Sequence, residues 1–194
     1  LEKGAEYAVV DDPSLPNTRP DKADRLIVVD DALQTLQALA REHRRELGLP
    51  ILTITGSNGK TTTKELVSRV LAEKYEVYAT RGNLNNHIGV PLTLLAMTRD
   101  VEFGIVEMGA SACGEIALLC SIAEPNYGIV TNIGRAHLEG FGGPEGVRRG
   151  KGELYDWLAR TGGRVFVPAN DPVLMSMAAE RETLAAECYP TTLA

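Results

Sequence analysis

The 194-residue sequence contains no long hydrophobic run and no excess of positive charge. Its longest uncharged stretch, Gly82–Thr98, includes several asparagines, a histidine and a proline, and is too polar to span a bilayer. The formal net charge is −6, which argues against the clustered basic surface of a nucleic-acid-binding protein. A nucleotide site stays open, because backbone N–H groups and a few local cations suffice to bind phosphate.

Cysteine is also scarce, with Cys113, Cys120 and Cys188 and no CxxC pair. If Cys113 and Cys120 share a helix, they lie about 10 Å apart along its axis, beyond the disulfide reach of about 7 Å between Cα atoms. With no visible targeting segment, this pattern predicts a reducing, cytoplasmic setting. We find no internal repeat, and the length suffices for one domain or for one domain plus part of another.

Apolar patterning predicts the order of the elements. Short apolar runs favour strands at 6–10, 25–30, 51–55, 77–80, 103–108, 128–133 and 164–167. Helical spacing favours helices at 32–47, 61–74, 91–97, 115–123 and 147–159, the second with Leu66, Val67, Val70 and Leu71 inward. Residues 13–24 read as a polar loop, and 41–45 as a solvated helix face. Apolar strands alternating with helices predict an α/β fold, a mostly parallel sheet with helices on both faces.

The strongest motif is a phosphate loop, which directly follows the strand at 51–55 and directly precedes a helix. It reads Thr55-Gly56-Ser57-Asn58-Gly59-Lys60-Thr61-Thr62, the short GxxGKTT form. Its glycines allow a tight turn that brings N–H groups to phosphate, and the helix start adds partial positive charge. The Lys60 ammonium is expected to neutralise the β- and γ-phosphates of ATP, and the Thr61 hydroxyl to ligate Mg²⁺.

Further polar side chains follow strands that should end at the same edge of the sheet, where ligands bind in such folds. Glu107 ends an apolar strand, and a carboxylate there suits Mg²⁺. His137 follows the strand at 128–133, although a single histidine is more often structural. Lys151 could simply lie on an exposed helix face. The amides of 83–87 could contact substrate or serve only as loop and cap residues.

Four further stretches carry a resemblance to a known family: GNLNNHIGVP at 82–91, VEMGA at 106–110, NIGRAHLEGFG at 132–142 and KGELYD at 151–156. With the short phosphate loop, they resemble the Mur ligase superfamily. Within it they are most similar to the members that join D-alanyl-D-alanine to UDP-N-acetylmuramoyl-tripeptide in peptidoglycan synthesis. The resemblance extends over essentially the whole chain.

The resemblance implies an ATP-dependent ligase with two Mg²⁺ ions, acting as a monomer on those two substrates. It implies that Glu107 bridges the metals, that His137 and a carbamylated Lys151 hold the second one, and that Asn83, Asn85 and Asn86 face the acyl substrate. Residues 1–47 correspond to the end of a UDP-substrate-binding N-terminal domain and 48–194 to an incomplete central ATP-binding domain. No C-terminal domain is included, so we expect these residues alone to be inactive in ligation.

The chain departs from the family pattern at two places, Ser111-Ala112-Cys113 and Pro168-Ala169-Asn170-Asp171. The first places one substrate-side contact in question. Three alternatives stay open: another Mur ligase or a folylpolyglutamate synthase, a phosphate-loop NTPase or kinase outside the superfamily, and a non-catalytic nucleotide-binding module. The shortness of the loop speaks against the second of these.

Overall fold

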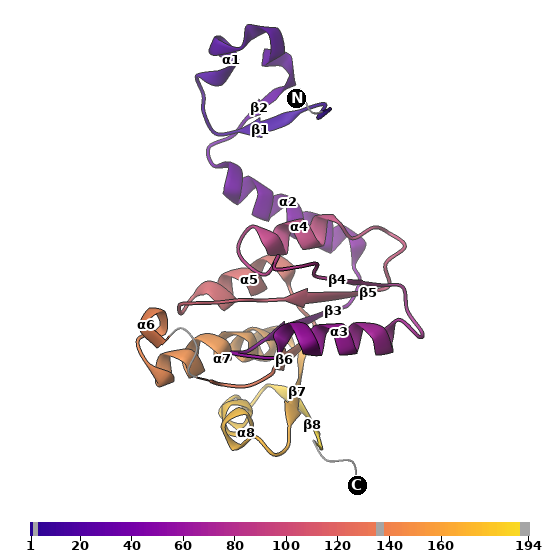
Figure 1. Cartoon of the computed structure of the whole chain (residues 1–194), viewed down its shortest axis with the longest axis vertical. Helices are drawn as coiled ribbons and strands as arrows, with labels where there is room; N and C mark the ends of the chain where they lie inside the picture. The colour runs from indigo at the N-terminus through magenta and orange to yellow at the C-terminus, as the bar shows by residue number, and fades with distance from the viewer. Residues whose placement is uncertain (2–3, 135–137, 191–194) are drawn as a thin grey trace.

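The computed structural model describes residues 1, 4–134 and 138–190, and Figure 1 shows two sheets joined by a helix. A small parallel pair is formed by β1 (Ala8–Val10) and β2 (Leu26–Val28), with Ala8 opposite Leu26. Between them, the predicted loop contains two short helices, α1 (Leu15–Thr18) and the 3₁₀-helix η1 (Pro20–Arg25). Helix α2 (Ala32–Leu47) then leads to the larger sheet.

The larger sheet has six parallel strands in the order β4-β5-β3-β6-β7-β8. Its strands are β3 (Ile51–Thr55), β4 (Val77–Ala79), β5 (Phe103–Glu107), β6 (Tyr127–Val130), β7 (Arg164–Pro168) and β8 (Ala185–Tyr189). Its helices are α3 (Lys60–Leu71), α4 (Gly89–Leu95), α5 (Glu115–Ala123), α6 (Leu138–Phe141), α7 (Pro144–Thr161) and α8 (Pro172–Ala179). The predicted α/β class, a parallel sheet with helices on both faces, is confirmed.

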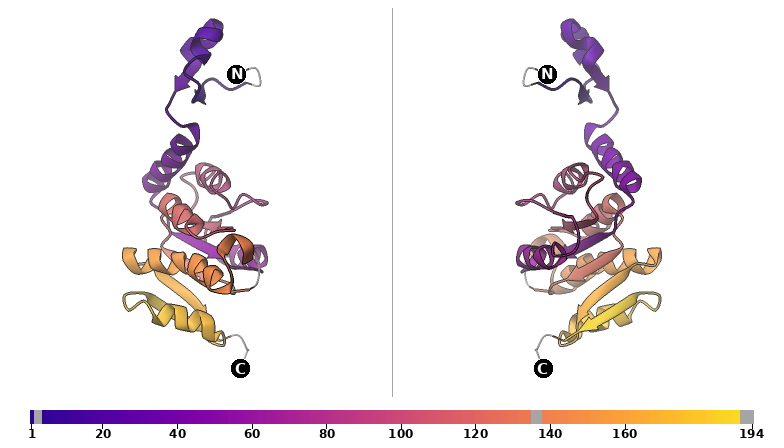
Figure 2. Two further views of the ribbon diagram at one scale, coloured as in Figure 1. Left: turned by 90° about the vertical axis from the view of Figure 1, so that its left-hand side faces the viewer. Right: turned by 90° about the vertical axis from the view of Figure 1, so that its right-hand side faces the viewer.

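The two faces of this sheet are covered unequally. Helices α5, α7 and α8 lie on one side and α3 on the other, as Figure 2 shows in its two side views. The larger core cluster contains residues of α2, α4, α5, α7 and α8, whereas a smaller cluster around Ile54 and Ile105 receives Val67 and Leu71 from α3. Among the described residues, no helix is long and apolar enough to cross a membrane.

Two predicted orientations are wrong. Leu66 and Val70 of α3 were expected to face inward, but they are 61% and 72% exposed. The inner line of α3 runs instead through Lys64, Val67 and Leu71, which are spaced by three and four residues. The apolar periodicity was placed in the wrong phase because a lysine occupies one buried position of the helix.

The helix face predicted to be solvated, residues 41–45, is the second correction. Arg44 is buried, and its guanidinium donates to the carbonyls of Ala123 and Glu124 and to Asn126 Oδ1, each at 3.0 Å. His43 Nε2 lies 2.9 Å from the carbonyl oxygen of Met97. These contacts attach α2 to the larger sheet, because the loop between α5 and β6 presents carbonyl groups to it.

Candidate functional site

The phosphate loop joins β3 to α3, and its backbone conformation requires glycine at two positions. Gly56 has φ +138° and Gly59 has φ +77°. A Cβ atom on Gly56 would lie 2.0 Å from Thr131 Oγ1 and 3.0 Å from Thr131 N. Glycine is therefore required at position 56 for two reasons: its φ is positive, and a side chain would prevent the close approach of the loop to the residue that follows β6.

The segment after β6 holds this loop in shape. Ser57 N and Asn58 N donate to the carbonyl and side-chain oxygens of Asn132, at 3.2 and 3.1 Å. In return, Thr131 Oγ1 donates to the Asn58 carbonyl at 2.6 Å, and Gly134 N donates to Ser57 Oγ at 2.9 Å. Thr131 and Asn132 were not predicted as site residues, although their position just beyond a strand at the carboxyl edge is a usable signal.

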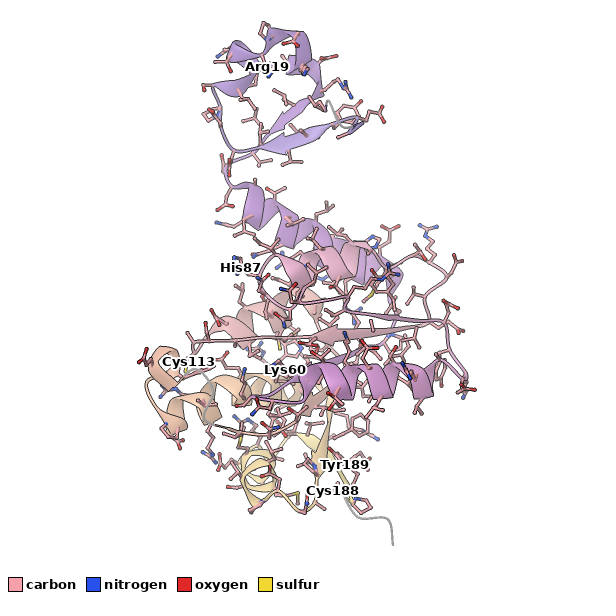
Figure 3. The ribbon with its side chains drawn as sticks, in the orientation of Figure 1. Arg19, Lys60, His87, Cys113, Cys188 and Tyr189 are labelled. Atoms are coloured by element: carbon pink, nitrogen blue, oxygen red, sulfur yellow. The ribbon has the colours of Figure 1, made fainter. Side chains whose placement is uncertain are left out.

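Lys60 and Thr61 stand at the first turn of α3. Lys60 Nζ donates to the carbonyl of Gly56 at 3.0 Å, so the ammonium folds back over its own loop. Figure 3 labels Lys60 at the start of α3. The first N–H groups of a helix lack partners within the helix and carry partial positive charge. Ammonium, free amides and helix end thus converge on one point, an arrangement suited to binding phosphate.

The carboxylate of Glu107, at the end of β5, meets this helix start. Glu107 is buried, and its Oε2 accepts a hydrogen bond from Thr61 Oγ1 at 3.0 Å. Its other oxygen, Oε1, accepts from Asn85 Nδ2 at 2.9 Å. A hydroxyl and a carboxylate oxygen in contact beside a phosphate loop are a donor set that fits Mg²⁺. Glu107 and Thr61 are therefore brought together as the sequence predicted.

The three asparagines expected to face substrate have different surroundings. Asn85 orients Glu107, whereas Asn86 Oδ1 accepts from the N–H groups of Ile88 and Gly89, at 3.1 and 2.9 Å, at the start of α4. Asn83 is exposed. A cleft of about 540 Å³ has Lys60, Asn85 and Asn86 in its wall, together with His87, Gly109, Ala110, Ser111, Glu115, Leu118 and Leu119. Asn83 does not line this cleft.

Lys151, on α7, is buried, and its Nζ lies 3.4 Å from the carbonyl oxygen of Ala110 in the wall of the cleft. Burial and, to a smaller extent, the nearby Lys60 ammonium lower the pKa of Lys151 to about 8, although Glu115 and Glu153 act in the opposite direction. A solvated Lys151, the alternative considered from the sequence, is therefore wrong. The structure brings this amine within electrostatic reach of the phosphate loop.

Two carboxylates hold the loop between β5 and α5, which forms one wall of the cleft. Glu115 accepts from the N–H groups of Ser111 and Ala112, at 2.6 and 3.2 Å. Burial acts to raise the pKa of Glu115, but these bonds, the Ser111 hydroxyl and the nearby Lys151 together lower it. Glu153, on α7, accepts from the N–H groups of Gly114 and Ala117, at 2.5 and 2.9 Å. Neither role was predicted, because each depends on which amides the fold leaves free.

His137 lies outside the described residues. The segments on either side of it are placed: Gly134 contacts the phosphate loop, and α6 ends in the buried Phe141. The Phe141 ring lies under the Lys151 amine, with Nζ 5.4 Å from its centroid. Among the residues that the structure does describe, no group of three or more His, Cys, Asp or Glu could hold a metal ion. Of the residues predicted from the sequence to hold a metal, Thr61 and Glu107 are in direct contact in the described part of the chain.

This fold and this edge define a parallel α/β protein of the phosphate-loop nucleotide-binding class. Residues 54–189 match the family described as the Mur ligase middle domain. The chain belongs to the Mur ligase family.

Two curated relatives are named for one activity. The chain is 44% identical to the UDP-N-acetylmuramoyl-tripeptide–D-alanyl-D-alanine ligase of Bacillus subtilis, over 87% of this chain and 36% of that protein. The ligase of the same name from Escherichia coli is 39% identical, over 70% of the chain and 30% of that protein. The chain therefore spans about a third of the length of these curated relatives.

Solved structures agree with this placement. MurF ligase from Thermotoga maritima in complex with ADP has a TM-score of 0.85 and 31% identity, covering 99% of this chain and 43% of that one. MurF from Acinetobacter baumannii also gives a TM-score of 0.85, with 32% identity over 96% of this chain and 40% of that one.

Proposed function

We propose that this chain carries the ATP-binding part of a ligase that joins D-alanyl-D-alanine to UDP-N-acetylmuramoyl-tripeptide. The observation that carries the proposal is the contact of Thr61 Oγ1 with the buried carboxylate of Glu107, beside a cleft that Lys60 also lines. The activity for which the relatives are named supports the choice of substrates. In this proposal, residues 1–47 would be the end of a UDP-substrate-binding domain and 48–194 an incomplete ATP-binding domain, in a monomer that acts in the cytoplasm.

The proposed reaction has two steps. A carboxylate oxygen of the tripeptide attacks the γ-phosphorus of ATP, the bond from that phosphorus to the β–γ bridging oxygen breaks, and ADP leaves. The amine nitrogen of D-alanyl-D-alanine then attacks the acyl carbon, gives up a proton and displaces inorganic phosphate. The first step brings two anions together, so the protein's main task is to offset their repulsion and hold them in line.

The chain's own residues match that task. The Lys60 ammonium, which contacts the Gly56 carbonyl, would turn toward the β- and γ-phosphates. The amides at the start of α3 would bind the same phosphates. The cleft beside Lys60 would receive the tripeptide carboxylate, with Asn85 and Asn86 in its wall.

Metal ions complete the proposal. Thr61 and Glu107 would hold Mg²⁺, which spreads the negative charge of the phosphates when bound. A second ion is assigned to Glu107, His137 and Lys151, the last as a carbamate formed when its amine nitrogen bonds to the carbon of CO₂ and loses a proton. The cleft-side position of Lys151, at the Ala110 carbonyl, supports that assignment.

Nucleotide binding by this chain is the first test. The chain should bind ATP weakly, and Lys60→Ala should abolish that binding, whereas Lys74→Ala, an exposed lysine after the same helix, should not change it. Equal binding by the chain and its Lys60→Ala variant would contradict the site.

The reaction itself is tested by phosphate release in a polypeptide that supplies the parts of the relatives that this chain does not span. Each substrate is omitted in turn, and release should require both the nucleotide-sugar peptide and D-alanyl-D-alanine. Lys60→Ala should lower kcat by about 100-fold or more. Release driven equally well by a different amino-acid acceptor would assign the chain to another member of the family. Ligation by the 194 residues alone would contradict the expectation that they are inactive by themselves.

A further inference from the structure

Lys64 is a charged residue at a core position, one helical turn after the phosphate loop. It lies on the inner side of α3 with 2% of its surface exposed. Burying an ammonium is costly unless it is paired or hydrogen-bonded, and a leucine would fill the same position without that cost. The motif residues already described do not explain why a lysine is present here.

The contacts of Lys64 point to the end of β4. Its Nζ donates to the carbonyl of Thr80 at 2.7 Å and pairs with Glu65 Oε1 at 3.0 Å. Thr80 is also buried, and its Oγ1 accepts a hydrogen bond from the backbone N–H of Glu107 at 2.9 Å. Lys64 therefore holds the residue that in turn holds the backbone of Glu107.

These contacts connect α3 to Glu107 by two routes. Helix α3 carries both Thr61 and Lys64, which are three residues apart and so neighbours on the helix surface. Thr61 contacts the Glu107 carboxylate directly, and Lys64 reaches the Glu107 backbone through Thr80. Helix α3 thus fixes the side chain of Glu107 through Thr61 and the backbone of Glu107 through Lys64 and Thr80. A shift at Thr80 would change the distance between the Thr61 hydroxyl and the carboxylate.

We propose that Lys64 and Thr80 are positioning residues that hold Glu107 at metal-binding distance from Thr61 and so set the affinity of the site for a divalent cation with nucleotide. The inference rests on the proposed function, because it presumes that Glu107 and Thr61 bind the cation. Groups behind the direct ligands of a metal commonly change its affinity by about 10–100-fold when removed. Lys64 and Thr80 lie behind Glu107 in this sense, because they support its backbone and neither lines the cleft.

A matched pair of substitutions at Thr80 tests this with little change in volume. Thr80→Val removes the oxygen that accepts from Glu107 N, whereas Thr80→Ser keeps it. We would measure Mn²⁺ binding to the 194-residue chain by electron paramagnetic resonance in the presence of ATP, and ATP binding in EDTA separately. Thr80→Val should weaken Mn²⁺ binding by about tenfold or more while leaving metal-free ATP binding unchanged, and Thr80→Ser should retain the native affinity.

Lys64→Met is the second variant, with Lys74→Met as its exposed control. It should weaken Mn²⁺ binding as Thr80→Val does, and the double variant should lose little more than either single one, because the two act through one route. Native Mn²⁺ affinity in Thr80→Val would overturn the inference while leaving the proposed function intact. Equal weakening of metal-free ATP binding would also overturn it, since a distorted loop would then be the cause. An unsubstituted chain that binds ATP without any effect of Mn²⁺ would overturn the metal assignment itself.

Discussion

Gly56→Ala is the substitution for which the structure yields the clearest magnitude. The substitution should lower the stability for two reasons: the backbone has φ +138°, and the new Cβ would lie 2.0 Å from Thr131 Oγ1. An unfavourable left-handed backbone costs about 1–2 kcal/mol. Turning the Thr131 hydroxyl away breaks its bond to the Asn58 carbonyl, about 1 kcal/mol, and backbone adjustment against Thr131 N adds about 1–2 kcal/mol. The expected loss is about 3–5 kcal/mol.

A matched control separates the two causes. Gly48 also has a positive φ, +65°, but a Cβ there would meet nothing within 4 Å, so Gly48→Ala should cost only about 1–2 kcal/mol. The free energy of unfolding is measured by urea denaturation without nucleotide, followed by circular dichroism. Adding Thr131→Ala to Gly56→Ala should restore about 1 kcal/mol, since it removes the nearest atom. Equal losses at Gly56 and Gly48 would refute the close approach between the phosphate loop and β6.

Two further predictions concern α7. Because the pKa of Lys151 is about 8 in the folded chain and 10.5 when unperturbed, the unfolded state binds more protons than the folded state between these two pH values. Burying the charged amine costs about 3 kcal/mol, and this cost should disappear as the pH rises from about 8 to 10.5. Lys151→Met should therefore have a higher free energy of unfolding than the unsubstituted chain in CO₂-free buffer, and the difference should be largest below about pH 8. A difference that does not change with pH would contradict the prediction. Glu153→Ala should lower the unfolding free energy by about 1–2 kcal/mol, because the amides of Gly114 and Ala117 lose their acceptor, and Glu153→Gln should lose less. Equal losses in these two variants, in a urea titration, would argue against the amide contacts.

The loop at 110–115, which departs from the family pattern at Ser111-Ala112-Cys113, is held largely through its backbone. Its amides are held by Glu115 and Glu153, and the carbonyl of Ala110 faces Lys151. None of these bonds involves the side chains of Ala112 or Cys113. Of the three departing residues, Ser111 lines the cleft, and Cys113 Sγ donates to the carbonyl of Gly146 in α7 at 3.4 Å.

Local chemistry along the sequence determined much of the fold of this protein. The residues at 51–55, 115–123 and 32–47 form the predicted elements with the predicted bounds. Their signals lie within a few neighbouring residues: an apolar run, a helical spacing, and glycines that permit a turn. The phosphate loop is of this kind, since strand, glycines, lysine and helix are adjacent along the chain. Strand β8 was missed because it is an exposed edge strand without an apolar run.

Only the tertiary structure decided which distant residues meet. The contact of Asn85 with Glu107, the burial of Lys64 under Thr80 and the carbonyls that receive Arg44 all join positions many residues apart. Helical periodicity states which side chains share a face, but not which face the rest of the chain covers. Pairing a buried charge depends on three-dimensional neighbours, so Lys64 and Arg44 read as surface residues until the sheet and its loops are placed around them.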